Sequence, residues 1–381
     1  MFGRKKHSAA GFGAQTVPKP KTSGNYLSFI GDCSLGKAER DLYSSLRESV
    51  PIIDAAIGKI VRLTGCFSIV TEDGKAQKTA DDFVKNVRVN STDIGLMSFV
   101  SRYLDSLLTY GEAVGEMIPD SSGREIAALY NASLDDVELS IDKNPMDIIV
   151  SSRRDGVPVP VDYPQLVVAG LLDQKPGKAR GTSVLSGLPF VSSVLLRILE
   201  SVKTNWERVG DVRFAVTYNP GDNGVFTEEN ARQIADEWKK AMRGDSVCDF
   251  VSLGDVSVKV IGAENRMPDC EIPVRVILEQ IVAKLGIPPF LLGLSWSSTE
   301  RMSAQQADIL TSELEYYRAA AEPAIKKIVG THLRLSGYNC GFDVVWESIN
   351  LQDEVELSQA RLNNANAMRI ERESGLEELN G

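Results

Sequence analysis

Histidine and cysteine are scarce in this sequence, and neither is arranged for chemistry. The 381 residues include two histidines and five cysteines. The cysteines are odd in number and never form a C-x-x-C pair, which disfavours a zinc site and a disulfide framework and indicates thiols kept reduced in a cytoplasm. A Ser-His-Asp or Cys-His enzyme would have to use His332, which no nucleophile motif accompanies. We therefore expect no enzymatic activity, no cofactor and no metal.

Long apolar runs are also missing. No run approaches the ~18 residues that a membrane span needs, and the basic N-terminus MFGRKKHSAAGFG has no apolar segment typical of a secretory signal. We therefore expect no membrane partner.

Basic residues are outnumbered, 42 to 52, which gives a formal charge of −10. Conventional nucleic-acid binding depends on clustered Lys and Arg that release counterions, so this balance disfavours it. It leaves open a protein that surrounds DNA without gripping it.

Apolar spacing predicts an α+β first half. Residues 1–34 have the composition of a mobile basic arm. Apolar residues at helical spacing over 35–64 predict a helix that Pro51 restarts and Gly65 ends. CFSIV predicts a strand, and Ser91 or Thr92 is expected to cap the next helix. Short alternating runs over 110–172 predict antiparallel sheet.

The second half is predicted to contain long helices around a small α/β unit. A helix is expected over 183–209, kinked early by Pro189. Two further helices are expected within 228–243 and 273–285. A capping box at Ser303 predicts the start of the longest helix, kinked at Pro323. The strands expected beside them are DVRFAVTY, DFVSL, VSVKVIG and FDVVWESI.

Two local patterns have competing interpretations. Gly31–Lys37 has the G-x-x-x-x-G-K spacing of a P-loop, but Ala38 stands where a Ser or Thr must hold Mg²⁺, so a loop before a helix is favoured. Trp206 and Trp238 lie at helical core spacing and are interpreted as packing residues. Trp296 lies in a loop rich in Pro, Gly and Ser, where an exposed side chain would indicate a contact.

The order of these elements resembles the portal proteins of tailed bacteriophages. The matching segments are YGEAVGEMI, GTSVLSGLPFVSSVLLRILESVKTNWERVGDVRFAV and ILEQIVAKLGIPPFLLGLSWSSTERMSAQQADILTSELEYYRAAAEPAIKKI. The step G-I-P-P-x-L-L-G, followed by a Ser/Thr-rich loop and a long helix broken at E-P, is the most specific of them. The resemblance covers roughly residues 35–360.

The resemblance implies a portal fold with an α/β wing, a two-helix stem, a small α/β clip, a long kinked helix and a short helical crown. The implied parts are the arm 1–34, wing 35–180, stem helix 181–210, clip 211–265, second stem helix 266–286, tunnel-loop region 287–303, second part of the wing 304–350 and an acidic tail or crown 351–381.

The implied function is a ring, typically of twelve copies, at one capsid vertex of the virion. DNA is packaged and ejected through such a ring. The implied partners are other copies of the chain, double-stranded DNA, the terminase large subunit, a head–tail adaptor and the major capsid and scaffold proteins. Synthesis is expected in the cytoplasm of the bacterial host. The alternatives are a P-loop-like nucleotide-binding enzyme and another structural head or connector protein.

Candidate site residues follow from the same resemblance. The DNA channel and tunnel loop would contain Ser295, Trp296, Ser297, Ser298, Thr299 and Arg301. The stem candidates are Arg197, Lys203 and Lys284. The candidates for partner binding in the clip are Arg213, Lys239, Lys240 and Arg243.

Overall fold

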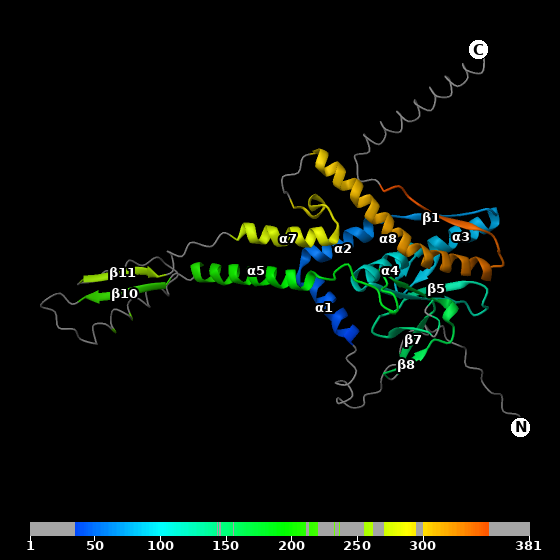
Figure 1. The fold of residues 1–381 in the computed structure, drawn as a ribbon, viewed down its shortest axis with the longest axis horizontal. Coiled ribbons are helices and arrows are strands. Elements are labelled where there is room, and N and C mark those ends of the chain that lie inside the picture. Colours follow the sequence, from blue (N-terminus) through cyan, green and yellow to red (C-terminus); the bar gives the residue numbers. More distant parts are fainter. Residues whose placement is uncertain are drawn as a thin grey trace, which may run out of the picture. The chain divides into compact units, whose positions relative to one another are not determined.

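The computed structural model describes residues 35–142, 144, 146–154, 156–210, 213–219, 232, 236, 255–261, 270–294 and 300–349 (Figure 1). Its mixture of helices and strands confirms the α+β class. The chain divides into two compact units. One contains residues up to Ser192 and from Glu279 onward, and the other contains Ser193–Leu278.

The first unit begins with a helix pair. Helices α1 (Leu35–Ser49) and α2 (Pro51–Leu63) are separated at Val50, and Pro51 is the first residue of α2 as predicted. A proline fits this position because its missing N–H would have no helical partner there. Gly65, at φ +78°, ends the helix in the left-handed conformation that favours glycine.

Three sheets follow from the alternating segments. A five-stranded sheet has the order β3-β2-β5-β4-β9, and a three-stranded sheet has the order β6-β7-β8. Strands β1 and β12 form a two-stranded ribbon that pairs Phe67 with Trp346. The strand bounds are β1 Phe67–Thr71, β2 Arg88–Val89, β3 Asp93–Ile94, β4 Glu112–Pro119, β5 Ile126–Asn131, β6 Val137–Ile141, β7 Ile148–Arg154, β8 Val157–Pro160, β9 Val167–Leu171 and β12 Phe342–Trp346.

Helix α4 (Leu96–Tyr110) provides the centre of the core. It contacts α2, β4 and β5, and most of its apolar side chains are buried. Phe99 and Tyr103 lie where a side chain on Gly115 or Gly170 would have to be, so the two strands need glycine at these positions. Gly115 on β4 and Gly170 on β9 therefore have a packing reason.

The helix starts correct three predictions. Neither Ser91 nor Thr92 caps α4, because the turn between β2 and β3 uses that stretch and Gly95 precedes the helix. Helix α5 (Leu188–Gly210) starts five residues later than predicted, after Gly187 at φ +89°. Pro189 thus falls in the first turn, where it removes no helical hydrogen bond and requires no kink.

Helix α8 (Glu300–Leu335) starts three residues before the expected capping box at Ser303. Glu, Arg and Met are strong helix formers, so residues 300–302 can extend the helix ahead of the box. Pro323 lies inside α8, as predicted. Helix α3 (Gly74–Asn86), capped by Asp73, and the short helices η1 (Pro164–Leu166) and η2 (Pro289–Leu292) complete this unit.

The second unit contains a hairpin. Strands β10 (Arg213–Asn219) and β11 (Asp255–Ile261) pair antiparallel, which places Arg213 opposite Ile261. Of the helix predicted over 228–243, the structure describes Arg232 and Asp236, both helical. Helix α7 (Glu271–Leu285) begins two residues before the predicted start.

Arg318 of α8 joins three distant segments of the first unit. Its Nε donates to the carbonyl oxygen of Thr64 at 2.7 Å, and its guanidinium lies 5.1 Å from the ring centre of Trp346. The side chain is buried, and Thr64 is the residue that ends α2. A cation is favourable at this carbonyl end of a helix.

Replacing Arg318 with Met should therefore lower the free energy of unfolding by about 2–4 kcal/mol, because a buried carbonyl loses a charged donor. The matched control is Arg334→Met in the exposed last turn of the same helix, with an expected effect of about 0.5 kcal/mol or less. Urea unfolding of the two variants measures both values. Equal losses would show that Arg318 has no special role.

His332 of α8 is a buried core residue. Its ring stacks on Phe83 with centroids 3.9 Å apart, and its Nδ1 accepts the N–H of Ile126 at 3.4 Å. Burial lowers the pKa of His332 to about 4, although the nearby Asp82 opposes this shift. The histidine that a catalytic mechanism would have to use therefore serves packing.

The free energy of unfolding should fall as the pH drops from about 6.5 toward 4. In this range His332 binds a proton in the unfolded chain but stays neutral in the folded protein. The slope from this group reaches about 1.4 kcal/mol per pH unit. His332→Asn keeps an acceptor in place of Nδ1 and should flatten the profile. Urea titrations at several pH values test this, and parallel profiles for the two proteins would refute the assignment.

Candidate functional site

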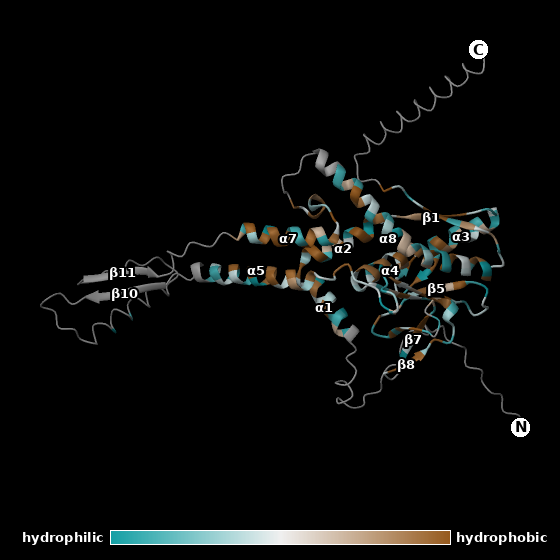
Figure 2. Ribbon diagram, viewed as in Figure 1, coloured by the Kyte–Doolittle hydropathy of each residue, from teal (hydrophilic) through white to brown (hydrophobic). Residues whose placement is uncertain are grey.

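Helix α5 presents an apolar stripe that the described part of its own chain leaves exposed. Leu196, Leu199 and Trp206 are 39%, 48% and 59% exposed. With Lys203 they recur at the i, i+3, i+7 and i+10 spacing of one helix face. Lys203 forms an i,i+4 ion pair with Glu207, its Nζ 3.8 Å from Oε1. Figure 2 shows hydrophobic and hydrophilic residues alternating along α5. We call Leu196, Leu199, Lys203 and Trp206 the α5 stripe.

A separate face of α5 is polar. Ser193, Arg197, Glu200 and Thr204 share it at the i, i+4, i+7 and i+11 spacing, and the first three are exposed. This face lies about a third of a turn from the stripe at 3.6 residues per turn. Arg197 and Lys203, which the sequence analysis grouped together, therefore point in different directions from the same helix.

Helix α7 also combines an exposed face with a buried one. Ile272 and Val276 are 67% and 51% exposed, whereas Ile281 and Leu285 in its last turns are buried. Lys284 is exposed in the last turn, where a cation suits the helix dipole.

The exposed face of α8 contains Ile309 and Tyr316, which are 64% and 44% exposed. The Tyr316 hydroxyl donates to Oδ1 of Asp173 at 2.6 Å. Burial, then this hydrogen bond, raises the pKa of Tyr316 to about 12. Asp173 has φ +45° and follows β9, so the contact ties α8 to the segment that leads from β9 toward α5.

The predicted tunnel-loop residues Ser295, Trp296, Ser297, Ser298 and Thr299 lie outside the described part of the chain. So do Lys239, Lys240 and Arg243. Arg301 lies in the first turn of α8 and so belongs to a helix, whereas the prediction placed it in a loop. Arg213 lies on β10. The roles of these residues stay predictions.

Trp206 corrects another prediction. Its helical spacing predicts a packing residue, but within this chain it is largely exposed. One sequence signal could have indicated this exposure. The apolar residues of α5 spread around the helix from Val194 to Leu196, an arc wider than a single packing face occupies. Helical spacing alone does not show whether an apolar face is covered by the same chain or by another one.

The part of the chain that the structure describes contains no group of three or more His, Cys, Asp or Glu side chains that could hold a metal ion. Among its helices, none is both long and apolar enough to cross a membrane. Of the P-loop-like segment, Gly31 to Ser34 lie outside the described residues, and Lys37 and Ala38 lie in α1.

No protein-family model and no curated protein sequence matches the chain. Solved structures do match. A chain in the virion of the native gene transfer agent (GTA) particle is 13% identical, with a TM-score of 0.62 over 85% of this chain and 89% of that one. A chain in the neck of the native GTA particle, computed with C12 symmetry, is 14% identical, with a TM-score of 0.60 over 85% of this chain and 88% of that one.

An HK97-family phage portal protein from Corynebacterium diphtheriae is 14% identical, with a TM-score of 0.45 over 80% of this chain and 95% of that chain. The resemblance predicted from the sequence is confirmed as a likeness of fold. The likeness to the GTA chains extends over most of this chain and most of each matched chain.

Proposed function

We propose that this chain is a phage portal protein, which forms a closed ring at one vertex of a capsid. Double-stranded DNA enters and leaves through the ring. The terminase large subunit and a head–tail adaptor dock on it, and the capsid and scaffold proteins surround it in the virion. The fold shared with chains of a particle neck that was computed with C12 symmetry supports a ring of twelve copies.

The α5 stripe is the observation that carries this proposal. A closed ring needs a heterologous interface, in which one face of each copy meets a different face of the next. Leu196, Leu199 and Trp206 offer apolar area of the kind that such interfaces bury. With the stripe against a neighbouring copy, the polar face around Arg197 would be left toward the channel.

The remaining residues fit the same arrangement. Each copy contributes one Arg197 and, on the same polar face, one Glu200, so charges of both signs are repeated around the axis. The chain as a whole carries a formal charge of −10, so it repels the duplex in general. Such a lining suits DNA that must slide, because tight phosphate contacts would slow it. Under this proposal Lys203 belongs to the contact between copies and Arg197 to the channel.

Exchanging both Leu199 and Trp206 for Ser should abolish ring formation. At about 25 cal/mol per Å² of apolar area, the two side chains together contribute several kcal/mol to every contact between copies. Light scattering after size exclusion and negative-stain microscopy measure the assembly, and circular dichroism confirms the fold. The control is the double exchange of Arg197 and Thr204 for Ser on the polar face, which should leave rings intact. Unchanged rings in the Leu199/Trp206 variant would contradict the role of the stripe.

Replacing residues 295–301 with Gly and Ser should leave rings intact but impair DNA packaging or retention. The proposed reason is that Trp296 and Arg301, together with the serines and threonine between them, make weak contacts to the DNA backbone. The amount of nuclease-protected DNA per particle is the measurement. An unchanged DNA yield would count against a tunnel loop in this segment.

A further inference from the structure

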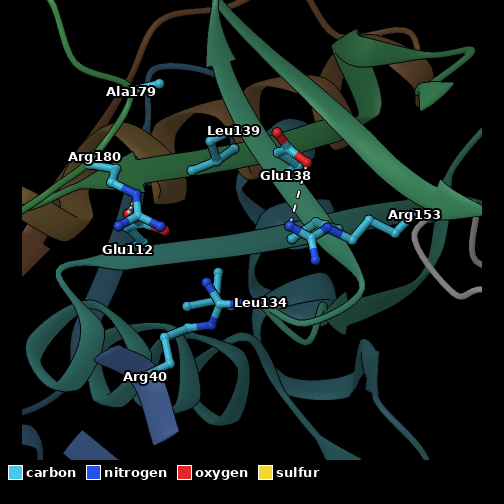
Figure 3. A pocket seen from close by; sticks show the side chains of 9 residues that line it. Arg40, Glu112, Leu134, Glu138, Leu139, Arg153, Ala179 and Arg180 are labelled. Atoms are coloured by element: carbon cyan, nitrogen blue, oxygen red, sulfur yellow. Dashed lines mark hydrogen bonds and ion pairs between the residues drawn. The ribbon is translucent and has the colours of Figure 1, made fainter. Parts of the chain in front are cut away.

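A small polar cavity lies in the first unit, between α1, β4, the β6–β7 hairpin and the segment before α5 (Figure 3). It measures about 100 Å³, several times the ~10–15 Å³ that one water needs. Its charged lining consists of Arg40, Glu112, Glu138, Arg153 and Arg180. Three guanidinium groups against two carboxylates give the lining a net charge of +1.

The ion pairs of Arg180 are long. Its closest approaches are 3.5 Å to Glu39 and 4.0 Å to Glu112. Other pairs are much shorter, for example 2.9 Å between Arg40 and Asp135 and 2.6 Å between Arg102 and Asp93. Charged hydrogen bonds favour about 2.7–2.9 Å. The Arg180 guanidinium therefore keeps unused capacity to donate.

Arg40 supplies an unsatisfied donor. Its Nη2 donates to Asp135 at 2.9 Å, but its buried Nε has no hydrogen-bond partner among the residues that the structure describes. An unpaired buried donor costs about 1–3 kcal/mol, more when it is charged, so such atoms in folded proteins generally have a partner. An acceptor small enough to enter the cavity would satisfy this donor.

Two carboxyl groups, Glu112 and Glu138, oppose an anion here, and Glu112 is the more buried, at 13% exposed against 42%. Burial and the nearby Glu39 raise the pKa of Glu112, although Arg180 and Arg40 oppose this shift. The carboxyl group thus gives up its charge more readily than an ordinary glutamate when a second negative group approaches.

We propose that this cavity binds a small tetrahedral oxyanion, phosphate or sulfate, held by Arg40, Arg153 and Arg180. Such an ion has acceptor oxygens pointing in several directions and matches the fork of donors on each guanidinium. It would join α1, the β6–β7 hairpin and the segment that leads into α5. This proposal is independent of the ring.

Inorganic phosphate is the probe. At constant ionic strength, replacing chloride with phosphate should raise the melting temperature of the full-length protein, and calorimetric titration should give a dissociation constant. Arg180→Gln should weaken that binding at least about tenfold, the value of one charge-assisted hydrogen bond. Arg102→Gln removes the same charge from the Arg102–Asp93 pair, away from the cavity, and should bind phosphate like the unmodified chain. A cavity filled with water alone would show no phosphate-specific shift, and equal binding by the Arg180 variant would likewise overturn the proposal.

Glu112→Gln gives a test of opposite sign. It removes the opposing charge and should tighten phosphate binding several-fold, a gain that misfolding cannot imitate. Unchanged or weaker binding in this variant would contradict the site.

A duplex oligonucleotide separates free oxyanions from the phosphates of DNA. The cavity is too small for a duplex to enter, so duplex binding should be equal with and without Arg180→Gln. Duplex binding that depends on Arg180, without any effect of free phosphate, would overturn the proposal in favour of a DNA contact.

Discussion

The first unit depends on one buried contact between distant parts of the chain. Arg318 donates to Thr64 across 254 positions of sequence and lies against Trp346. The same region pairs β1 with β12, so a strand near the beginning of the described chain and one near its end form one ribbon. Loop-closure entropy opposes such long-range pairing, and a buried charged hydrogen bond with aromatic packing helps to offset that cost. These contacts fix the long helix α8 to the end of α2 and to β12.

Local features of this fold could be predicted because they depend on local chemistry. Pro51 at a helix start and Gly65 at a helix end need no tertiary information. The predictions that failed concern helix starts at which more than one local structure could form. Ser303 has the spacing of a capping box, but the helix begins earlier, and Thr92 lost its expected role to a turn between two short strands. In both stretches, neighbouring residues offer alternative helix starts or turns of similar strength, and only tertiary packing decides which one forms.

The site was harder to predict than the fold because the residues of the α5 stripe differ from core residues only in being exposed to solvent. Trp206 and Leu195 have the same kind of neighbours in sequence, yet Leu195 is buried and Trp206 is exposed. Helical spacing places both on the apolar arc and cannot separate them. Arg40, Arg153 and Arg180 come from three separate segments of the chain, and no sequence motif connects them. Their convergence follows from tertiary packing, which brings α1 beside the segment before β6, where Arg40 pairs with Asp135.

Charge and apolar contact act over different distances in the proposed ring. Each copy carries a formal charge of −10, so like charges oppose assembly over roughly the Debye length of ~8 Å at physiological salt. Apolar contacts through Leu199 and Trp206 act at short range and are weakened little by salt. Added salt therefore reduces the repulsion between copies while it also weakens any attraction between Arg197 and DNA phosphates. Added salt should therefore favour assembly and weaken DNA contact. Because the two depend on different interactions, a ring can be stable while it binds the duplex only weakly.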